Sequence, residues 1–195
     1  MTLDRARVVD KQFIQRVKAG DWPLPKSSTI PATVNLDKEK AIILFDSQLK
    51  SRLLDLIARR LKEKNLAFYT IGSSGHEGNG VLGEVFRYTD MAFLHYRSGA
   101  FYLQRAKQLP SQDGVSDILF SLVAAARDPI SGGRHKVFGS VMLNIPPQTS
   151  TIASHLPKAL GAALSINRAK VLNFQGNLGE DSVILCSFGD ASINH

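Results

Sequence analysis

Asp190 is the residue of this sequence whose type and position suggest chemistry most directly. It follows an apolar segment, Val-Ile-Leu-Cys-Ser-Phe at 183–188, which predicts a buried strand, and Gly189-Asp190 predicts a tight turn at its end. Open α/β folds bind ligands at the carboxyl ends of their strands, and a glycine there lets the backbone approach a phosphate. Asp190 is therefore the first candidate for a metal ligand.

Two other segments carry residues suited to an anion. Residues 71–80 are rich in glycine, include His76 and precede an apolar pattern, so their amides are candidates for binding an anion at a helix N-terminus. Tyr96-Arg97 ends the apolar segment 91–96, where an arginine can hold a phosphate and a tyrosine can pack on a ring. A plain turn with a hydrogen-bonded histidine, and a surface arginine that caps a carbonyl, are the structural alternatives.

Two loops add further polar groups. The glycine-rich basic loop 131–136 either closes over an anionic substrate or merely connects two elements, and its His135 can exchange a proton near neutral pH. Residues 149–154 place four hydroxyl side chains directly before a predicted helix, which suits a cation or a phosphate oxygen as well as an ordinary polar loop.

Several classes of function are disfavoured by patterns that the sequence lacks. It has no Gly-x-Ser-x-Gly elbow for serine hydrolysis and no histidine or cysteine pairs spaced for zinc. The net charge of +7 permits an anionic partner, but the basic residues are spread along the chain, so nucleic acid is not expected. No apolar run approaches the ~20 residues of a membrane-spanning helix. The lone Cys186 fits a reducing compartment, and a cytoplasmic location is expected.

The spacing of apolar residues predicts the elements that position these groups. Helices are expected over about 5–18, over about 46–65, between Asp113 and Asp128, and from Ser154 onward. Asp113 and Ser154 are the expected N-caps of the last two. The last of these is unusually smooth because it is rich in alanine and glycine, so we expect it to pack closely on a sheet.

Short apolar strands are expected at 67–70, 91–96 and 183–188, in alternation with the helices. This order predicts an α/β fold with a parallel sheet covered on both faces. We predict an N-terminal helical and extended arm over 1–36, with a proline-rich stretch to Pro31, and one domain over 37–195.

Five motifs, taken in chain order, resemble the α subunit of the thiamine-diphosphate-dependent 2-oxo acid dehydrogenase E1 component. They are Gly75-His76-Glu77-Gly78, His95-Tyr96-Arg97-Ser98, Gly132-Gly133-Arg134-His135, the run from Gln148 to Ala163, and Gly189-Asp190. The likeness spans about residues 40–195 and is greatest to versions whose α and β parts are fused in one chain. It implies a thiamine-diphosphate-binding fold, a parallel sheet flanked by helices, that is incomplete at the C-terminus.

The resemblance also implies where thiamine diphosphate and Mg²⁺ would bind. Tyr96 and Arg97 occupy the positions of a Tyr-Arg pair at the cofactor, with Arg97 on the diphosphate. Ser150 and the backbone of Ile152 would approach the cofactor. Gly189, Asp190 and Ala191 begin the cofactor motif, with Asp190 on Mg²⁺ and Ala191 in place of the usual glycine.

Some members of that family bind a structural potassium ion at the positions of Thr149, Ser154 and His155. Here His155 stands where the family has a glutamine.

By this resemblance the complete protein would decarboxylate a 2-oxo acid oxidatively and pass the acyl unit to a lipoyl group, with the cofactor supplying the chemistry. Its partners would be an E1 β subunit or a fused β half, and a lipoyl-bearing E2 acyltransferase, within an oligomer. Further family residues, an asparagine and a histidine, would lie beyond His195, so we expect the chain to be a fragment that is inactive alone.

Two other interpretations stay open. A non-catalytic binding or regulatory remnant of the same fold would account for the departures at His155 and Ala191. A generic phosphate-binding α/β protein, unrelated to thiamine, would use Arg97 and Asp190 for other anions and cations.

Overall fold

The computed structural model describes residues 4–24, 34, 36–134, 137–148, 150–174, 178–179 and 181–194. The chain divides into two compact units, Met1–Lys38 and Glu39–His195. Residues 25–31 of the predicted proline-rich stretch, which begins at Asp21, lie outside the described residues, as do His135 and Thr149. None of the described helices combines the length and the apolarity that a crossing of a lipid bilayer requires.

The first unit contains the helix α1, Arg5–Ala19. The side chain of Asp4 caps its N-terminus by accepting hydrogen bonds from the amides of Ala6 and Arg7, at 3.1 and 3.3 Å. Gly20 ends the helix in a left-handed conformation, with φ of 64°, which glycine adopts without strain. The helix predicted for this segment is therefore confirmed.

The long helix α2, Lys38–Glu63, begins eight residues before the predicted start at residue 46. The prediction missed the first turns because Ile42 and Ile43 are 57% and 44% exposed there and do not continue the buried stripe. Farther along, α2 buries Leu54 in the hydrophobic core. The small side chain of Ser51 is also buried and lies next to Gly99 of α4.

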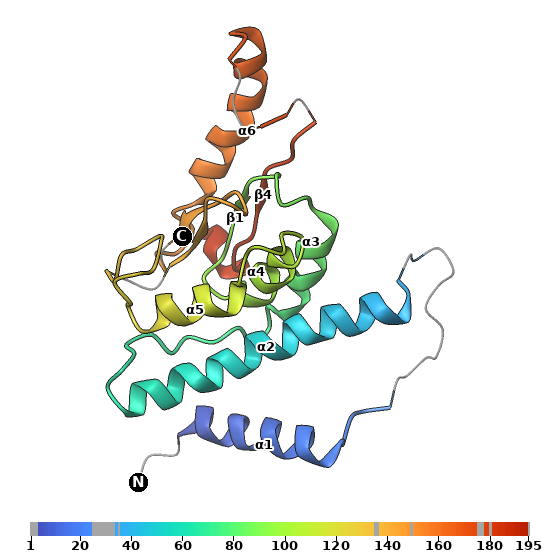
Figure 1. The fold of residues 1–195 in the computed structure, drawn as a ribbon, viewed down its shortest axis with the longest axis vertical. Helices are drawn as coiled ribbons and strands as arrows, with labels where there is room; N and C mark the ends of the chain where they lie inside the picture. The colour runs from blue at the N-terminus through green and yellow to red at the C-terminus, as the bar shows by residue number, and fades with distance from the viewer. Residues whose placement is uncertain are drawn as a thin grey trace. The chain divides into compact units, whose positions relative to one another are not determined.

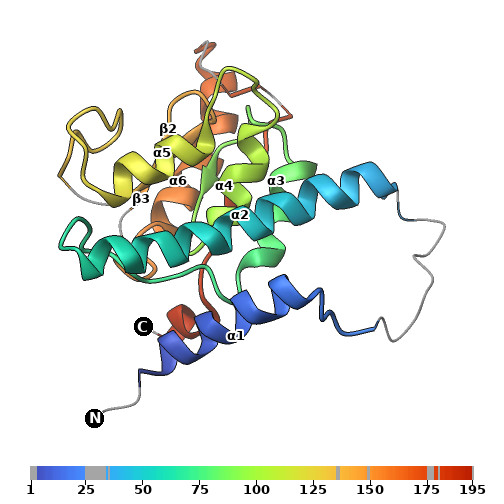
Figure 2. The ribbon, with the colours of Figure 1, turned by 60° about the horizontal axis from the view of Figure 1, so that its bottom comes forward.

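Two short helices pack tightly against each other in the second unit (Figure 2). The 3-10 helix η1, Glu77–Asn79, leads into α3, Gly80–Val85, and α4 spans Gly99–Ala106. Every residue of α4 is buried, including the polar Gln104 and Arg105. The helix was not predicted from the sequence because its eight residues are too few for a helical period to be recognised. The two helices approach so closely that a Cβ on Gly83 would lie 2.6 Å from the carbonyl oxygen of Phe101.

The strands form two small pairs. β1, Ala92–Phe93, runs parallel to β4, Leu185–Cys186, with Ala92 opposite Leu185. β2, Phe138–Ser140, runs antiparallel to β3, Ile145–Gln148. Figure 1 shows β1 and β4 side by side although nearly half of the chain lies between them in sequence.

The second unit is thus mixed α/β with a small parallel pair. The strand predicted at 67–70 is wrong, because that segment forms no regular secondary structure and pairs with no described strand. The β2–β3 hairpin was not predicted, since Pro146 and Pro147 interrupt the pattern of a strand.

The remaining helices are α5, Gly114–Leu122, and α6, Leu156–Val171. Asp113 caps α5 as predicted, through the amides of Val115 and Ser116, but the helix ends six residues before Asp128. Asp128 instead accepts hydrogen bonds from the amides of Ile130 and Ser131 and so fixes the turn that follows.

The helix α6 corrects two predictions. It does not pack closely on the sheet: Ala159 is its one buried residue, and its outer turns extend beyond the strands in Figure 1. Ser154 does not cap it, because the hydroxyl of Ser154 donates to the carbonyl of Thr151.

The glycines of α3 and α6 give a matched test of this packing. Gly83→Ala should lower the free energy of unfolding by about 1–3 kcal/mol, because the added methyl group would clash with the backbone of α4. Gly161→Ala, where a Cβ meets nothing within 4 Å on an exposed helix, should raise it by about 0.5–1 kcal/mol. Urea denaturation of both variants measures the two effects. Equal destabilisation of both variants would contradict the packing described here.

Candidate functional site

The parallel pairing of β1 and β4 brings two chemistry-bearing segments to one place. The amide of Leu185 donates to the carbonyl of Met91 and that of Ser187 to the carbonyl of Phe93, both at 2.9 Å. The chain then continues from both strands at the same end, as His95–Ser98 and as Ser187–Asp190. A Cβ on Gly189 would lie 3.6 Å from Nε2 of His95, so the two segments are in contact.

Three rings from two loops form a stack at this position. The imidazoles of His76 and His95 lie parallel, with ring centroids 4.5 Å apart and planes inclined by 5°. The ring of Tyr96 is tilted by 33° against that of His95, and their centroids lie 3.9 Å apart. His76 belongs to the glycine-rich segment 71–80, so this segment lies against the end of β1.

Hydrogen bonding defines the tautomer of His95. Its Nδ1 accepts a hydrogen bond from the amide of Arg97 at 3.2 Å, so in the neutral ring the proton resides on Nε2. Nε2 is the nitrogen that faces Gly189. The buried ring of His95 therefore directs an N–H group toward the turn that carries Asp190.

The stacked imidazoles are held in their neutral form. Burial is the main cause that lowers the pKa of His95 to about 4, and the nearby His76, Arg97 and His155 lower it further. Burial and Arg97 also lower the pKa of His76, whereas Glu77 and Asp190 act to raise it. Asp190 thus lies close enough to act electrostatically on the stack.

Arg97 carries a positive charge that no described carboxylate neutralises. Its Nη1 donates to the carbonyl of Gly72 at 2.6 Å, and its guanidinium carbon lies 5.5 Å from the centroid of the Tyr96 ring. Arg87, by contrast, pairs with both Asp90 and Asp181. A partly exposed guanidinium that is oriented but not paired is suited to bind an anion.

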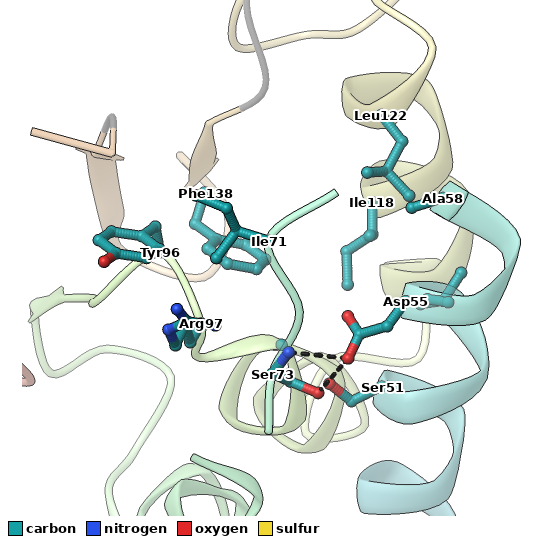
Figure 3. A pocket seen from close by; sticks show the side chains of 12 residues that line it. Ser51, Asp55, Ala58, Ile71, Ser73, Tyr96, Arg97, Ile118, Leu122 and Phe138 are labelled. Carbon is teal, nitrogen blue, oxygen red and sulfur yellow. Dashed lines mark hydrogen bonds between the residues drawn. The ribbon is translucent and has the colours of Figure 1, made fainter. Parts of the chain in front are cut away.

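Asp55 of α2 holds in place the loop that contains Gly72 and Ser73, and Figure 3 shows its hydrogen bonds to Ser73. The carboxylate of Asp55 accepts hydrogen bonds from the amide and the hydroxyl of Ser73, at 2.7 and 2.8 Å. A Cβ on Gly72 would lie 2.8 Å from Oδ2 of Asp55, so a side chain here would push the carboxylate aside. Asp55 thereby positions the carbonyl of Gly72 that holds Arg97.

A small cavity lies beneath Tyr96 and Arg97 (Figure 3). Its volume is about 20 Å³, which is room for about one water molecule. Its walls combine the polar groups of Ser51, Asp55 and Ser73 with apolar side chains from α2 and α5. The cavity is too small for a cofactor, so a ligand of Arg97 would have to bind on the open side of the guanidinium.

The loop before α6 reaches the same region through Ser150. Burial is the main cause that raises the pKa of Tyr69 to about 12, with Tyr96 adding to it and Arg97 and Ser150 opposing it. Tyr69, Tyr96, Arg97 and Ser150 therefore lie close together. Ile152, whose backbone the resemblance placed near the cofactor, is 50% exposed.

A polar cluster joins four segments behind the stack. The amide nitrogen of the Asn79 side chain lies 3.2 Å from Oγ of Ser187 and 3.4 Å from Oγ of Ser98, and the two hydroxyls are 3.3 Å apart. His155 joins this cluster through Nε2, which lies 2.8 Å from the carbonyl oxygen of Ser187.

The structure thus gathers many of the residues singled out in the sequence. His76, Tyr96, Arg97, Ser150, Gly189 and Asp190 lie around the carboxyl ends of β1 and β4, whereas His135 and Thr149 lie outside the described residues. Asp190 and Ala191 begin the 3-10 helix η2, Asp190–Asn194, and both are exposed.

The sequence analysis missed three contributors: Asp55, Tyr69 and Ser187. Asp55 lies on a charged helix surface where nothing distinguishes it from its neighbours. Ser187 precedes Gly189 by two residues, and this place at the strand end was the signal that could have identified it.

The donor set limits the metals that the site can hold. In the part of the chain that the structure describes, no three His, Cys, Asp or Glu side chains converge as ligands for one ion. Asp190 forms no ion pair with a described residue, and one carboxylate suits a Mg²⁺ ion that takes its other ligands from phosphate and water. No protein-family model matches this chain.

The depressed pKa of His95 predicts a loss of stability in mild acid. Between about pH 6.5 and 4 the unfolded chain binds a proton at this histidine that the folded chain does not bind, so the free energy of unfolding falls as the pH falls through this range. The loss attributable to His95 should reach about 1–3 kcal/mol.

His95→Asn removes this titration while its side-chain oxygen can still accept from the amide of Arg97. Denaturation at several values between about pH 7 and 5 should give a shallower pH dependence for the variant than for the natural chain. An unchanged slope would contradict the neutral stack.

Proposed function

We propose that this chain is the N-terminal, α-like part of a 2-oxo acid dehydrogenase E1 component that acts with thiamine diphosphate and Mg²⁺. The observation that carries the proposal is the meeting of four motifs from distant parts of the chain. The loop with His76, the Tyr96-Arg97 pair, Ser150 and the Gly189-Asp190 turn all lie at the carboxyl ends of β1 and β4. A cytoplasmic location is part of the same proposal.

The residues present fit a diphosphate bound together with Mg²⁺. Arg97 has its charge available, and its orientation is set by Gly72 and Tyr96. Asp190 offers a single exposed carboxylate, the kind of site at which Mg²⁺ takes its remaining ligands from phosphates and water. Gly189 leaves space beside His95 that a side chain would narrow.

In this proposal each residue binds or orients a defined group. Arg97 would hold the diphosphate and Asp190 the Mg²⁺ ion, while Tyr96 would pack on a ring and Ser150 and the Ile152 backbone would line the site. Gly189 and Ala191 would keep the backbone close to the ligand. When bound, thiamine diphosphate would supply the decarboxylation chemistry and the transfer of the acyl unit to a lipoyl group.

The partners follow from the same proposal. An E1 β subunit or fused β half would complete the active site, and a lipoyl-bearing E2 acyltransferase would accept the acyl group. Oligomerisation would bring these parts together. The size of the acyl chain depends on the shape of the completed pocket.

A second candidate is a non-catalytic binding domain with the same fold. The residue that favours it is Ala191, whose methyl group stands where the family motif has glycine. Such a domain would bind a protein partner without needing Asp190 or Mg²⁺.

Ligand binding to the full chain tests the proposal. We expect weak, Mg²⁺-dependent binding of thiamine diphosphate, in roughly the millimolar range, by titration calorimetry. Arg97→Gln should weaken it about tenfold or more by removing a charge-assisted contact, and Asp190→Asn should remove the dependence on Mg²⁺. The exposed Arg127, changed to Gln, is the matched control and should bind like the natural chain.

Inorganic pyrophosphate distinguishes the alternatives. If it binds as well as thiamine diphosphate, the site is a generic phosphate site. If neither ligand binds, and the two variants behave like the Arg127→Gln control, the thiamine proposal is wrong and the binding-domain alternative is favoured.

A further inference from the structure

The side chain of His155 connects the loop before α6 to the end of β4. The residue is 2% exposed, and its Nε2 lies 2.8 Å from the carbonyl oxygen of Ser187. A carbonyl oxygen can only accept, so Nε2 must carry the proton and donate it. Nδ1 is also buried and has no hydrogen-bond partner among the described residues.

The carbonyl that His155 holds belongs to a residue at the centre of the site. The backbone of Ser187 is paired with β1, through its amide and the carbonyl of Phe93. Its hydroxyl lies within hydrogen-bond distance of Asn79 and Ser98. Two residues later the chain reaches Gly189 and Asp190, so a fixed Ser187 limits where this turn can lie.

The potassium ion that the resemblance implied for this loop does not fit the side chains described. Such an ion needs oxygen atoms whose lone pairs converge on it. The hydroxyl of Ser154 instead donates to the carbonyl of Thr151 at 3.2 Å and accepts from the side-chain amide of Gln148 at 3.0 Å. The imidazole of His155 replaces an oxygen ligand and turns its N–H group toward Ser187. Thr149 lies outside the described residues.

We propose that His155 is a positioning residue. Its hydrogen bond to Ser187 holds the 150–155 loop against β4 and fixes the Gly189-Asp190 turn. The loop therefore needs no potassium ion to keep this position. This inference concerns the folded chain itself and does not require that thiamine diphosphate binds.

Thermal unfolding of the full chain in two salts tests the absence of potassium. The natural chain should have the same Tm in about 0.1 M KCl and in about 0.1 M choline chloride, where screening is equal. His155→Phe keeps the ring but loses the donor, and should lower Tm by about 2–8 °C in both salts. His155→Gln restores a donor and should recover part of that loss. A saturable rise of the natural chain's Tm in KCl alone would overturn the proposal.

Magnetic resonance of the same chains tests the positioning role separately from stability. In the natural chain, ring nitrogen signals should show His155 protonated at Nε2 and not at Nδ1. The amide of Ser192 donates to the carbonyl of Gly189 at 3.0 Å, so its hydrogen exchange reports on the turn. This exchange should accelerate in His155→Phe but not in Ser154→Ala, the neighbour that does not reach Ser187.

Either a proton on Nδ1 in the natural chain or unchanged exchange at Ser192 in His155→Phe would overturn the positioning role. If His155→Phe does not fold, the exchange measurement is made on His155→Leu, which also lacks the donor, and the tautomer of the natural chain still decides. Loss of thiamine diphosphate binding would leave these results unaffected, so the two proposals fail separately.

Discussion

The parallel pairing of β1 with β4 is the interaction on which the rest of the second unit's polar architecture depends. Asp90 holds the N-terminal ends of the two strands together, because it accepts hydrogen bonds from Arg87 and from the amide of Val183. Burial acts to raise the pKa of Asp90, yet these contacts hold it below its usual value, so the carboxylate stays charged. Arg87 also reaches Asp181 and so holds the approach to β4. If β1 and β4 were not paired, the His76–His95–Tyr96 stack, the polar cluster around Ser187 and the Gly189-Asp190 turn would no longer meet.

The electrostatic character of the site depends on which of its side chains are charged and which are neutral. Arg105 is fully buried and donates to the carbonyls of Asp90 and Leu143, so its guanidinium binds backbone groups inside the protein. Arg97 is oriented by a carbonyl and a ring but is not paired with a described carboxylate. Two neutral imidazoles stand next to it where protonated ones would add to its positive charge. The site therefore combines the guanidinium of Arg97, the exposed carboxylate of Asp190 and the neutral imidazoles of His76 and His95.

The sequence allowed the local features to be predicted better than the long-range ones. Asp113 and the segments around β1 and β4 were found because capping chemistry and short apolar runs are local signals. The helix α4 was missed because it is only eight residues long and buries polar as well as apolar side chains. The hairpin was missed because its strand contains two prolines. Likewise, the role of Asp55 depends on a partner in a distant loop, which no spacing reveals.

The separation of the two paired strands along the chain also determines when the site can form during folding. Joining Val183 to Asp90 closes a loop of 93 residues, and the entropy of that closure is lost before the pair gains any contacts. Local helices such as α2 do not bear this cost and can form early. The region where the imidazoles, the arginine and the carboxylate meet is accordingly assembled late. A ligand that binds there recognises only the finished unit, and its binding energy protects that unit against unfolding.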